Sequence, residues 1–531
     1  MQHDANPIPR PARLPMALLA GVLLLAAARF AALAWDAIHF PYEIDYGEGI
    51  VWQQMRSIVA GHGYARLEPY PAIVFHYPPL FHLLAGMVAA TGMDELAAGR
   101  LVAVACTLAA VAMAGLVVAG FARGPAERLP MRLGGAVAAV CLLATQPVLD
   151  WAVVMRVDMP FVALTFAGLW FGIQALRRPV LVHAAALCFV GAIYAKQTAI
   201  AAPLAVFAVL LAVRPRTALA GIVTGLATAG ALLAVMMVQT HGEFLHHILF
   251  YNINRFSWWA GQDLPIIIGM HFGLVLAAAP AYAPRLLAIR QRARDAGGLW
   301  PLLRAEPMAA AETILLLHLA IATAMLAMVF KSGSAPNYFL EWMVLVAIGC
   351  GLAVGDHLAR APLPGPRWVR WRAAVPWIVG IQTLAGATLM EADYDSRPER
   401  AADYARLAQA MRAAPAPIIS DDMVLLLRAG KPVVMEPSIF AELGSMGVLD
   451  ERPMLGRVQR HAFAMVVTDG SPGEPVFDSR YSPAMSRAIV TAYPQQFRLA
   501  QDYVVRLPAG PLPEWARGLA GGKSGEAAAG Q

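Results

Sequence analysis

The sequence predicts an α-helical polytopic membrane protein that ends in a small α/β domain outside the membrane. Three observations lead to this class: 59% of the 531 residues are hydrophobic, only 14% are charged, and the apolar residues gather in long runs. Soluble domains carry about 25% charged residues, so the composition excludes a cytosolic enzyme with one core. The net charge of +6 comes from arginines between apolar runs, which mark membrane topology rather than nucleic-acid binding.

The apolar runs predict about eleven transmembrane helices within residues 14–395. A span needs about 20 apolar residues, and the fifth and sixth candidates are short. The candidates are residues 14–35, 95–121, 131–148, 159–176, 180–194, 198–213, 217–238, 264–284, 309–330, 338–357 and 373–390.

The arginines predict the orientation of these spans, because short cytoplasmic loops collect Lys and Arg. If the N-terminal tail, residues 1–13, is cytoplasmic, every Arg-rich loop falls on the cytoplasmic side. The opposite side then receives three longer connections: a first outer loop at 36–94, residues 239–263, and the chain after 391. Counting Pro79–Thr91 as a span would invert everything after it, so we interpret Pro79–Thr91 as an interfacial helix, and His241–Trp259 likewise.

The composition changes after about residue 396, where a small α/β domain at 396–517 is predicted. Short apolar runs typical of strands alternate there with helical patterns. Residues 518–531 are rich in Gly and Ala and are predicted to be disordered. The expected strands are Pro417–Ile419, Val433–Met435 and Phe463–Thr468, and the expected helices are Glu399–Arg412, Glu451–Arg460 and Ser482–Tyr493.

Two carboxylates in the first outer loop, Asp45 and Glu48, are candidates for a general base. Such a base needs an acid with a tunable pKa within hydrogen-bond reach of the attacking hydroxyl. Their spacing is also that of a capping box that opens a helix over Tyr46–Ala60. The sequence leaves both interpretations open.

Further polar residues interrupt the apolar runs on the same predicted side. Arg156 and Asp158 occupy one outer turn, and an Arg held near a carboxylate can bind a phosphate-linked sugar. Asp158 could instead only cap the following helix, and Arg156 could be an interface anchor. Lys196 lies between two apolar helices, where it either snorkels to the interface or binds an anion. Lys331 opens the glycine-containing turn that leads to Tyr338; this turn suits a phosphate or is an ordinary loop.

The sequence does not indicate a cofactor. His241, Glu243, His246 and His247 have helical spacings that could hold a divalent metal. Such a cluster is more often the wet face of an interfacial helix, so we assign no metal ligands.

These candidates would all lie at one membrane surface although they span almost 300 residues of chain. An acid for a hydroxyl and cations for a phosphate, at the edge of the bilayer, suit transfer from a lipid-linked phosphate donor. A lipid phosphate can reach such a site without leaving the membrane.

The sequence resembles the integral-membrane glycosyltransferases of the GT-C type. The resemblance is to their bacterial branch around lipopolysaccharide-core galacturonosyltransferases, aminoarabinose transferases and protein O-mannosyltransferases. It covers about residues 14–390. The stretches that carry it are Asp45-Tyr-Gly-Glu48, His76-Tyr-Pro-Pro-Leu-Phe81, Arg100-Leu101, Met155-Arg-Val-Asp-Met-Pro160, Ala195-Lys-Gln-Thr198 and Asn337-Tyr-Phe-Leu340.

The resemblance implies an inverting transferase that moves a sugar from a polyprenyl-phosphate-linked donor to a lipid, glycan or protein acceptor. It places the enzyme in the bacterial inner membrane, in contact with membrane lipids, with transfer on the periplasmic side. Asp45 would be the base, with Glu48 as the less favoured candidate. Lys196, Lys331 and Tyr338 would contact the donor phosphate, and Arg156 and Asp158 would lie near the sugar.

Two departures from relatives leave the base and the sugar open. Many relatives have an Asp-Glu pair where this chain separates Asp45 from Glu48, and Glu341 stands where mannosyltransferase-type relatives often have another residue. The alternative functions are a transporter or flippase of a lipid-linked sugar and a non-catalytic envelope component. Transporters often carry internal repeats with sites near the bilayer midplane. This sequence shows no convincing repeat.

The arginine distribution predicts a cytoplasmic N-terminus and a periplasmic C-terminal domain. Alkaline phosphatase fused after residue 400 should therefore be active, whereas fusions after 125 and 290 should be inactive. Phosphatase activity at 290, or its absence at 400, would contradict this topology.

Overall fold

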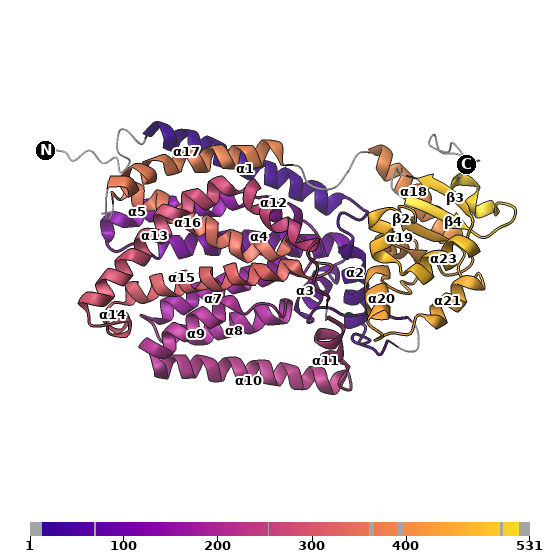
Figure 1. The fold of residues 1–531 in the computed structure, drawn as a ribbon, viewed down its shortest axis with the longest axis horizontal. Helices are drawn as coiled ribbons and strands as arrows, with labels where there is room; N and C mark the ends of the chain where they lie inside the picture. The colour runs from indigo at the N-terminus through magenta and orange to yellow at the C-terminus, as the bar shows by residue number, and fades with distance from the viewer. Residues whose placement is uncertain are drawn as a thin grey trace.

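A computed structural model describes residues 13–67, 71–252, 254–360, 366–390, 398–499 and 503–519. Residues 1–12 and 520–531, which include most of both predicted tails, lie outside the described residues. Long helices pack side by side in one body, and a small α/β unit lies at one end of this bundle (Figure 1). The predicted fold class is confirmed.

Each of the eleven predicted spans contains a helix. These helices are α1 (Arg13–His39), α4 (Glu95–Ala119), α5 (Pro125–Leu142), α7 (Asp158–Ala175), α8 (Leu181–Ala195), α9 (Ala201–Val213), α10 (Pro215–Gln239), α13 (Phe272–Asp295), α15 (Pro307–Met325), α16 (Leu340–Leu358) and α17 (Pro366–Leu389).

Six stretches of the described chain are long and apolar enough to cross a membrane. They are Leu14–His39, Glu95–Ala119, Pro215–Gln239, Phe272–Asp295, Pro307–Phe330 and Pro336–Leu358. Helices α8 and α9 have only 15 and 13 residues, as their short apolar runs predicted. The span predicted at 264–284 is not continuous, because the chain breaks at His271 between α12 (Asp263–Met270) and α13.

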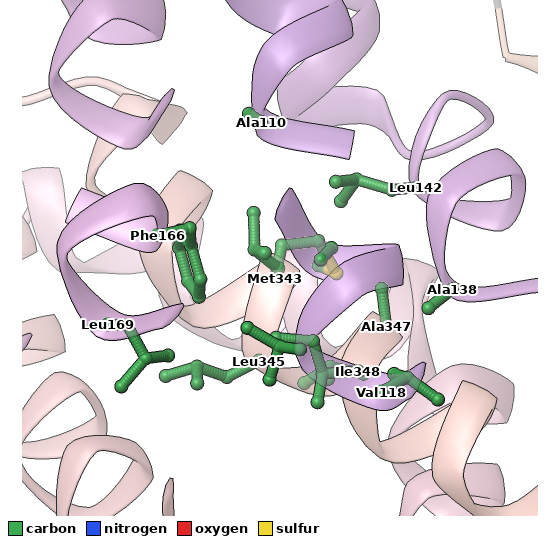
Figure 2. Packing of buried hydrophobic residues seen from close by; sticks show 14 of the residues in the cluster. Ala110, Val118, Ala138, Leu142, Phe166, Leu169, Met343, Leu345, Ala347 and Ile348 are labelled. Carbon is green, nitrogen blue, oxygen red and sulfur yellow. The ribbon is translucent and has the colours of Figure 1, made fainter. Parts of the chain in front are cut away.

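Helix α16 is the central helix of the bundle and is buried along almost its whole length. Figure 2 shows its Met343, Leu345, Ala347 and Ile348 packed among side chains of α4, α5 and α7. Glycines bring α5 and α16 into backbone contact: a Cβ atom on Gly134 would overlap the carbonyl oxygen of Gly351. Small residues allow this close approach, which is the usual means of packing helices within a bilayer.

Short helices connect the long ones. The stretch predicted as an interfacial helix at 79–91 forms α3 (Leu80–Ala89), and the helix expected over 46–60 is α2 (Gly47–Val59). Residues 241–259 are less helical than predicted, with only α11 (Glu243–Ile248) and η2 (Phe250–Asn252) before residue 253. The other short elements are α6 (Gln146–Trp151), η3 (Ala260–Gln262), α14 (Leu299–Ala305), η4 (Leu326–Phe330) and η5 (Pro336–Phe339).

The C-terminal unit is built on one four-stranded sheet with the order β1-β2-β4-β3. β1 pairs parallel with β2, and the other pairings are antiparallel. Its elements are α18 (Pro398–Ala413), β1 (Ile419–Ser420), α19 (Met423–Arg428), α20 (Pro437–Ser445), α21 (Arg452–Gln459), β2 (Val466–Asp469), α22 (Pro475–Arg480), α23 (Pro483–Ala492), β3 (Gln495–Leu499), β4 (Tyr503–Leu507) and η6 (Glu514–Leu519).

One predicted strand of this unit is wrong. Val433–Met435 does not join the sheet; its only β-type contact in the described chain is a parallel bridge between Met435 and Ala72 of the first outer loop. The apolar run is buried against that loop instead. The hairpin of β3 and β4 was not predicted.

A buried ion pair, Glu48–Arg100, joins the first outer loop to the bundle. Both side chains are 0% exposed. Arg100 donates from Nε to Glu48 Oε1 at 2.8 Å and from Nη2 to Oε2 at 2.6 Å. The carboxylate also accepts the backbone N–H groups of Met155 and Ile44, each at 2.8 Å. Glu48 therefore ties α2 to α4 and to the turn before α7.

Arg100 uses all of its N–H groups in this arrangement. Besides the two bonds to Glu48, Nη1 donates to the carbonyl oxygens of Ala37 at 2.7 Å and Phe40 at 2.5 Å, and Nη2 donates to that of Tyr42 at 2.6 Å. A guanidinium has five N–H donors, so none remains unpaired. These bonds end α1 and set the path of the loop that carries Asp45.

We predict that Arg100→Met strongly destabilises the protein, because it leaves the Glu48 carboxylate buried without its charged partner. Breaking a buried pair in this way costs about 3–5 kcal/mol. Thermal unfolding in detergent measures the effect, and Arg178→Met, at an exposed arginine, is the control. Equal melting temperatures for the two variants would contradict the assigned role.

Candidate active site

A cavity of about 530 Å³ lies where the bundle meets the C-terminal unit. Its walls come from α2, from the turns before α7 and α9, from the chain around Lys331, and from α20; Figure 1 shows α2, α11 and α20 at this junction. Four predicted site residues line it: Arg156, Lys196, Lys331 and Tyr338. The structure thus brings together side chains that are up to 182 positions apart in the sequence.

Asp45 lies beside the cavity and pairs with one of its lining cations. Its Oδ2 is 3.2 Å from Nη1 of Arg156 and accepts the backbone N–H of Gly47 at 3.0 Å. A Cβ atom on Gly47 would displace the Arg156 guanidinium from this position. Burial raises the pKa of Asp45 and outweighs the opposing charge of Arg156. The side chain is still 30% exposed.

Glu48 differs sharply from Asp45. It lies outside the cavity, and both of its oxygens accept hydrogen bonds from Arg100 and from backbone N–H groups. It also bonds back to the N–H of Asp45 at 3.4 Å, which is half of the predicted capping box. The second hydrogen bond of a capping box would join the N–H of Glu48 to the Asp45 side chain. Asp45 accepts the N–H of Gly47 instead, which forms a shorter turn.

Lys196 forms a buried pair with Asp158. Its Nζ donates to Asp158 Oδ1 at 2.6 Å, and the same oxygen accepts from Asn337 Nδ2 at 3.0 Å. The ammonium also lies 4.9 Å from the ring centre of Tyr338. Burial alone would lower the pKa of Lys196, but Asp158 and neighbouring groups raise it. Asp158 therefore keeps Lys196 charged and lies behind the cavity wall.

Lys331 is the more exposed of the two lysines. Its turn is attached to the loop after η2, where Ser332 N donates to the carbonyl oxygen of Arg255 at 2.7 Å. Burial, and then the charge of Lys196, lowers the pKa of Lys331. Two lysines close enough to repel each other share a cavity wall with Arg156, and an anion would relieve that repulsion.

Several cavity residues were not among the predicted site residues. His76 and Tyr77 line the cavity, although the sequence pointed to them only as part of a motif. Burial and the charge of Arg156 lower the pKa of His76 to about 3, so its ring is neutral. Its carbonyl oxygen accepts from Gln197 at 2.9 Å and from Asn252 at 2.7 Å.

The C-terminal unit also contributes side chains to the cavity. Glu436, Ser438 and Glu442 line it. The run before Glu436 was interpreted as a strand, and no local pattern marks Glu436 as a neighbour of Arg156. Long-range packing alone brings these side chains to the site.

The histidine-rich segment that could have held a metal makes other contacts. His246 pairs with Glu243 at 3.1 Å, whereas His247 accepts the N–H of Phe75 at 3.1 Å and contacts the carbonyl oxygen of Ala65. Across the described ranges, no group of three or more His, Cys, Asp or Glu side chains has a metal-binding arrangement.

Comparisons with known proteins identify the fold. No protein-family model matches the chain, and no curated protein sequence does. ArnT from Cupriavidus metallidurans in the apo state superposes with a TM-score of 0.58 at 17% identity, over 93% of this chain and 99% of that one. The same protein bound to undecaprenyl phosphate gives a TM-score of 0.56 at 15% identity, over 92% and 99%.

An archaeal protein has a similar structure. The oligosaccharyltransferase AglB from Archaeoglobus fulgidus, in complex with an inhibitory peptide and a dolichol-phosphate, gives a TM-score of 0.51 at 10% identity, over 96% of this chain and 77% of that one. Similarity at these identities establishes architecture. The chain therefore has the polytopic GT-C fold of ArnT, as the resemblance in its sequence implied.

Proposed function

We propose that the protein is an inverting glycosyltransferase that moves a sugar from a polyprenyl-phosphate-linked donor to a lipid, glycan or protein acceptor. The observation that carries this proposal is the meeting of Arg156, Lys196 and Lys331 in one cavity, with the Asp45 carboxylate paired to Arg156 at its wall. Solved structures with the same fold contain undecaprenyl phosphate and dolichol-phosphate, which supports a lipid-phosphate donor.

The charges favour a phosphate in this cavity. Asp45 and Asp158 each pair with one cation, while Lys331 has no carboxylate partner within the described part of the chain. Of the three cations on the bundle side, Lys331 is therefore the one available to an anion. Charge-assisted hydrogen bonds to phosphate are about twice as strong as neutral ones.

Asp45 is the better base of the two candidates. A base must reach the proton that it removes; Asp45 is partly exposed and pairs with a cavity residue, whereas Glu48 is enclosed by Arg100 and backbone donors. The raised pKa of Asp45 makes it a stronger proton acceptor than an ordinary aspartate.

The reaction would be a single displacement. An acceptor hydroxyl attacks the anomeric carbon and passes its proton to Asp45 while the bond from that carbon to the phosphate oxygen breaks. The polyprenyl phosphate leaves with the electron pair, and Arg156, Lys196 and Lys331 stabilise its added charge. One displacement inverts the anomeric centre.

The proposed location is the bacterial inner membrane, with the cavity at its periplasmic side. The six long apolar helices support membrane insertion, and the Arg-rich loops support this orientation. The polar groups gather at one end of the bundle, near the start of α16 and α7, rather than halfway along the helices, where transporter sites lie.

We predict that Lys331→Ala weakens the binding of undecaprenyl phosphate by ~10- to 150-fold without unfolding the protein. Loss of one charge-assisted hydrogen bond costs about 1.5–3 kcal/mol, and Lys331 supports no buried carboxylate. Binding of undecaprenyl phosphate to the purified protein measures the effect. Lys431→Ala, outside the cavity, should bind normally; equal affinity in both variants would reject Lys331 as a donor ligand.

We predict further that Asp45→Asn lowers turnover by ~10²–10⁴-fold, the usual contribution of a general base, while undecaprenyl phosphate still binds. An amide can keep the bond to Gly47 but cannot accept the proton. Mass spectrometry of envelope glycans from a deletion strain identifies the sugar that is lost, and complementation by each variant measures turnover.

Asp450→Asn is the matched control for this change. Asp450 accepts the backbone N–H of Arg452, two positions on, at 3.0 Å, as Asp45 accepts that of Gly47, and it lies outside the cavity. Restoration of the missing sugar by Asp45→Asn as well as by Asp450→Asn would exclude Asp45 as the base.

A further inference from the structure

The cavity has a second, acidic wall that the donor phosphate does not explain. Arg156, Lys196 and Lys331 belong to the bundle side, whereas Glu436 and Glu442 belong to the C-terminal unit. A phosphate bound to the cations would meet repulsion from these carboxylates if it extended toward the C-terminal unit. The two walls therefore suit two different chemical groups.

The backbone holds Glu436 at this wall. Met435 forms the β-bridge to Ala72, and Ala72 N donates to the carbonyl oxygen of Val434 at 3.3 Å. Glu436 then caps α20, its carbonyl oxygen accepting the N–H of Phe440 at 3.0 Å. Both ends of this short segment are thus fixed, so the side chain enters the cavity from a defined position.

The Glu436 carboxylate is buried without a hydrogen-bond partner for one of its oxygens. Glu436 is only 8% exposed, and within the described ranges no group forms a hydrogen bond with its Oε2. Burying a carboxylate in this state is costly. An unsatisfied buried group in a native structure calls for an explanation, and a ligand that completes its hydrogen bonds supplies one at a cavity wall.

Two arginines lie near Glu436, but neither forms a direct ion pair with it among the described residues. Arg156 from the bundle and Arg480 from α22 both act on it electrostatically, but neither is within 4.0 Å as a salt bridge in the described chain. Arg480 instead pairs with Asp421 at 3.1 Å and stacks on Tyr46 at 4.0 Å. Burial, opposed by the two arginines, raises the pKa of Glu436 to about 7.

We propose that Glu436 binds the acceptor through a hydrogen-bond donor that carries no negative charge, a sugar hydroxyl or a sugar amine. Ser438 lies beside it and shares the wall, with its Oγ 3.2 Å from the hydroxyl of Tyr46. The acceptor then lies within reach of Glu436 and of Arg156, the arginine that pairs with Asp45. This inference rests on the proposed transferase function and adds the chemical class of its second substrate.

The test measures the binding of three sugars to the full-length protein saturated with undecaprenyl phosphate, which occupies the cations. Glucosamine, glucose and glucuronate share one ring and differ in charge. Saturation-transfer NMR should show that glucosamine and glucose bind and that glucosamine binds roughly tenfold or more tightly than glucuronate, as expected for a charge-assisted hydrogen bond. Glu436→Gln should abolish the preference, whereas Glu474→Gln, a carboxylate of the same unit outside the cavity, should keep it.

Equal binding of the three sugars, or an unchanged preference in Glu436→Gln, would overturn the proposal. If Glu436→Gln does not fold, Glu436→Asp is tested instead. Its shorter carboxylate should weaken the preference for glucosamine over glucuronate if Glu436 contacts the sugar directly. Failure of undecaprenyl phosphate to bind would reject the donor site instead. The sugars would then be titrated onto the ligand-free protein, where the same comparison of variants tests Glu436.

Discussion

The buried pair between Glu48 and Arg100 is the interaction on which the site depends. In a bilayer every buried backbone polar group needs a partner inside the protein, and Arg100 supplies partners for three carbonyl oxygens at the end of α1 and the start of the first outer loop. Glu48 binds Met155 N–H, one residue before Arg156. The pair therefore fixes both the first outer loop, which carries Asp45, and the turn before α7, which carries Arg156, so that these two side chains form an ion pair.

A second constraint is the division of the cavity between the bundle and the C-terminal unit. The unit contacts the bundle closely: a Cβ atom on Gly49 of α2 would lie 2.6 Å from Met423 of α19, and Arg428 pairs with Asp94 at the start of α4. The unit is thus a wall of the cavity rather than an appendage. With cations on one wall and carboxylates on the other, the cavity offers different polar partners to a phosphate and to a hydroxyl-bearing substrate.

The sequence predicted the helices well because their apolar runs are local, continuous signals. It could not separate Asp45 from Glu48, since both lie in one loop and the difference between them is Arg100, 52 positions beyond Glu48. The strand expected at Val433–Met435 was wrong because an apolar run does not specify whether it packs on a sheet or on another loop. The break at His271 and the role of Glu436 likewise depend on contacts between distant segments, which periodicity does not report.

The central claim is that Arg156, Lys196 and Lys331 hold a lipid phosphate beside Asp45. An experimentally determined structure of the protein with bound undecaprenyl phosphate tests it most directly. We expect the phosphate in the cavity, within hydrogen-bond distance of Lys331 and at least one of the other two cations, with room for a sugar between a non-ester phosphate oxygen and Asp45. A phosphate bound elsewhere on the bundle, with the cavity left to another ligand, would contradict it.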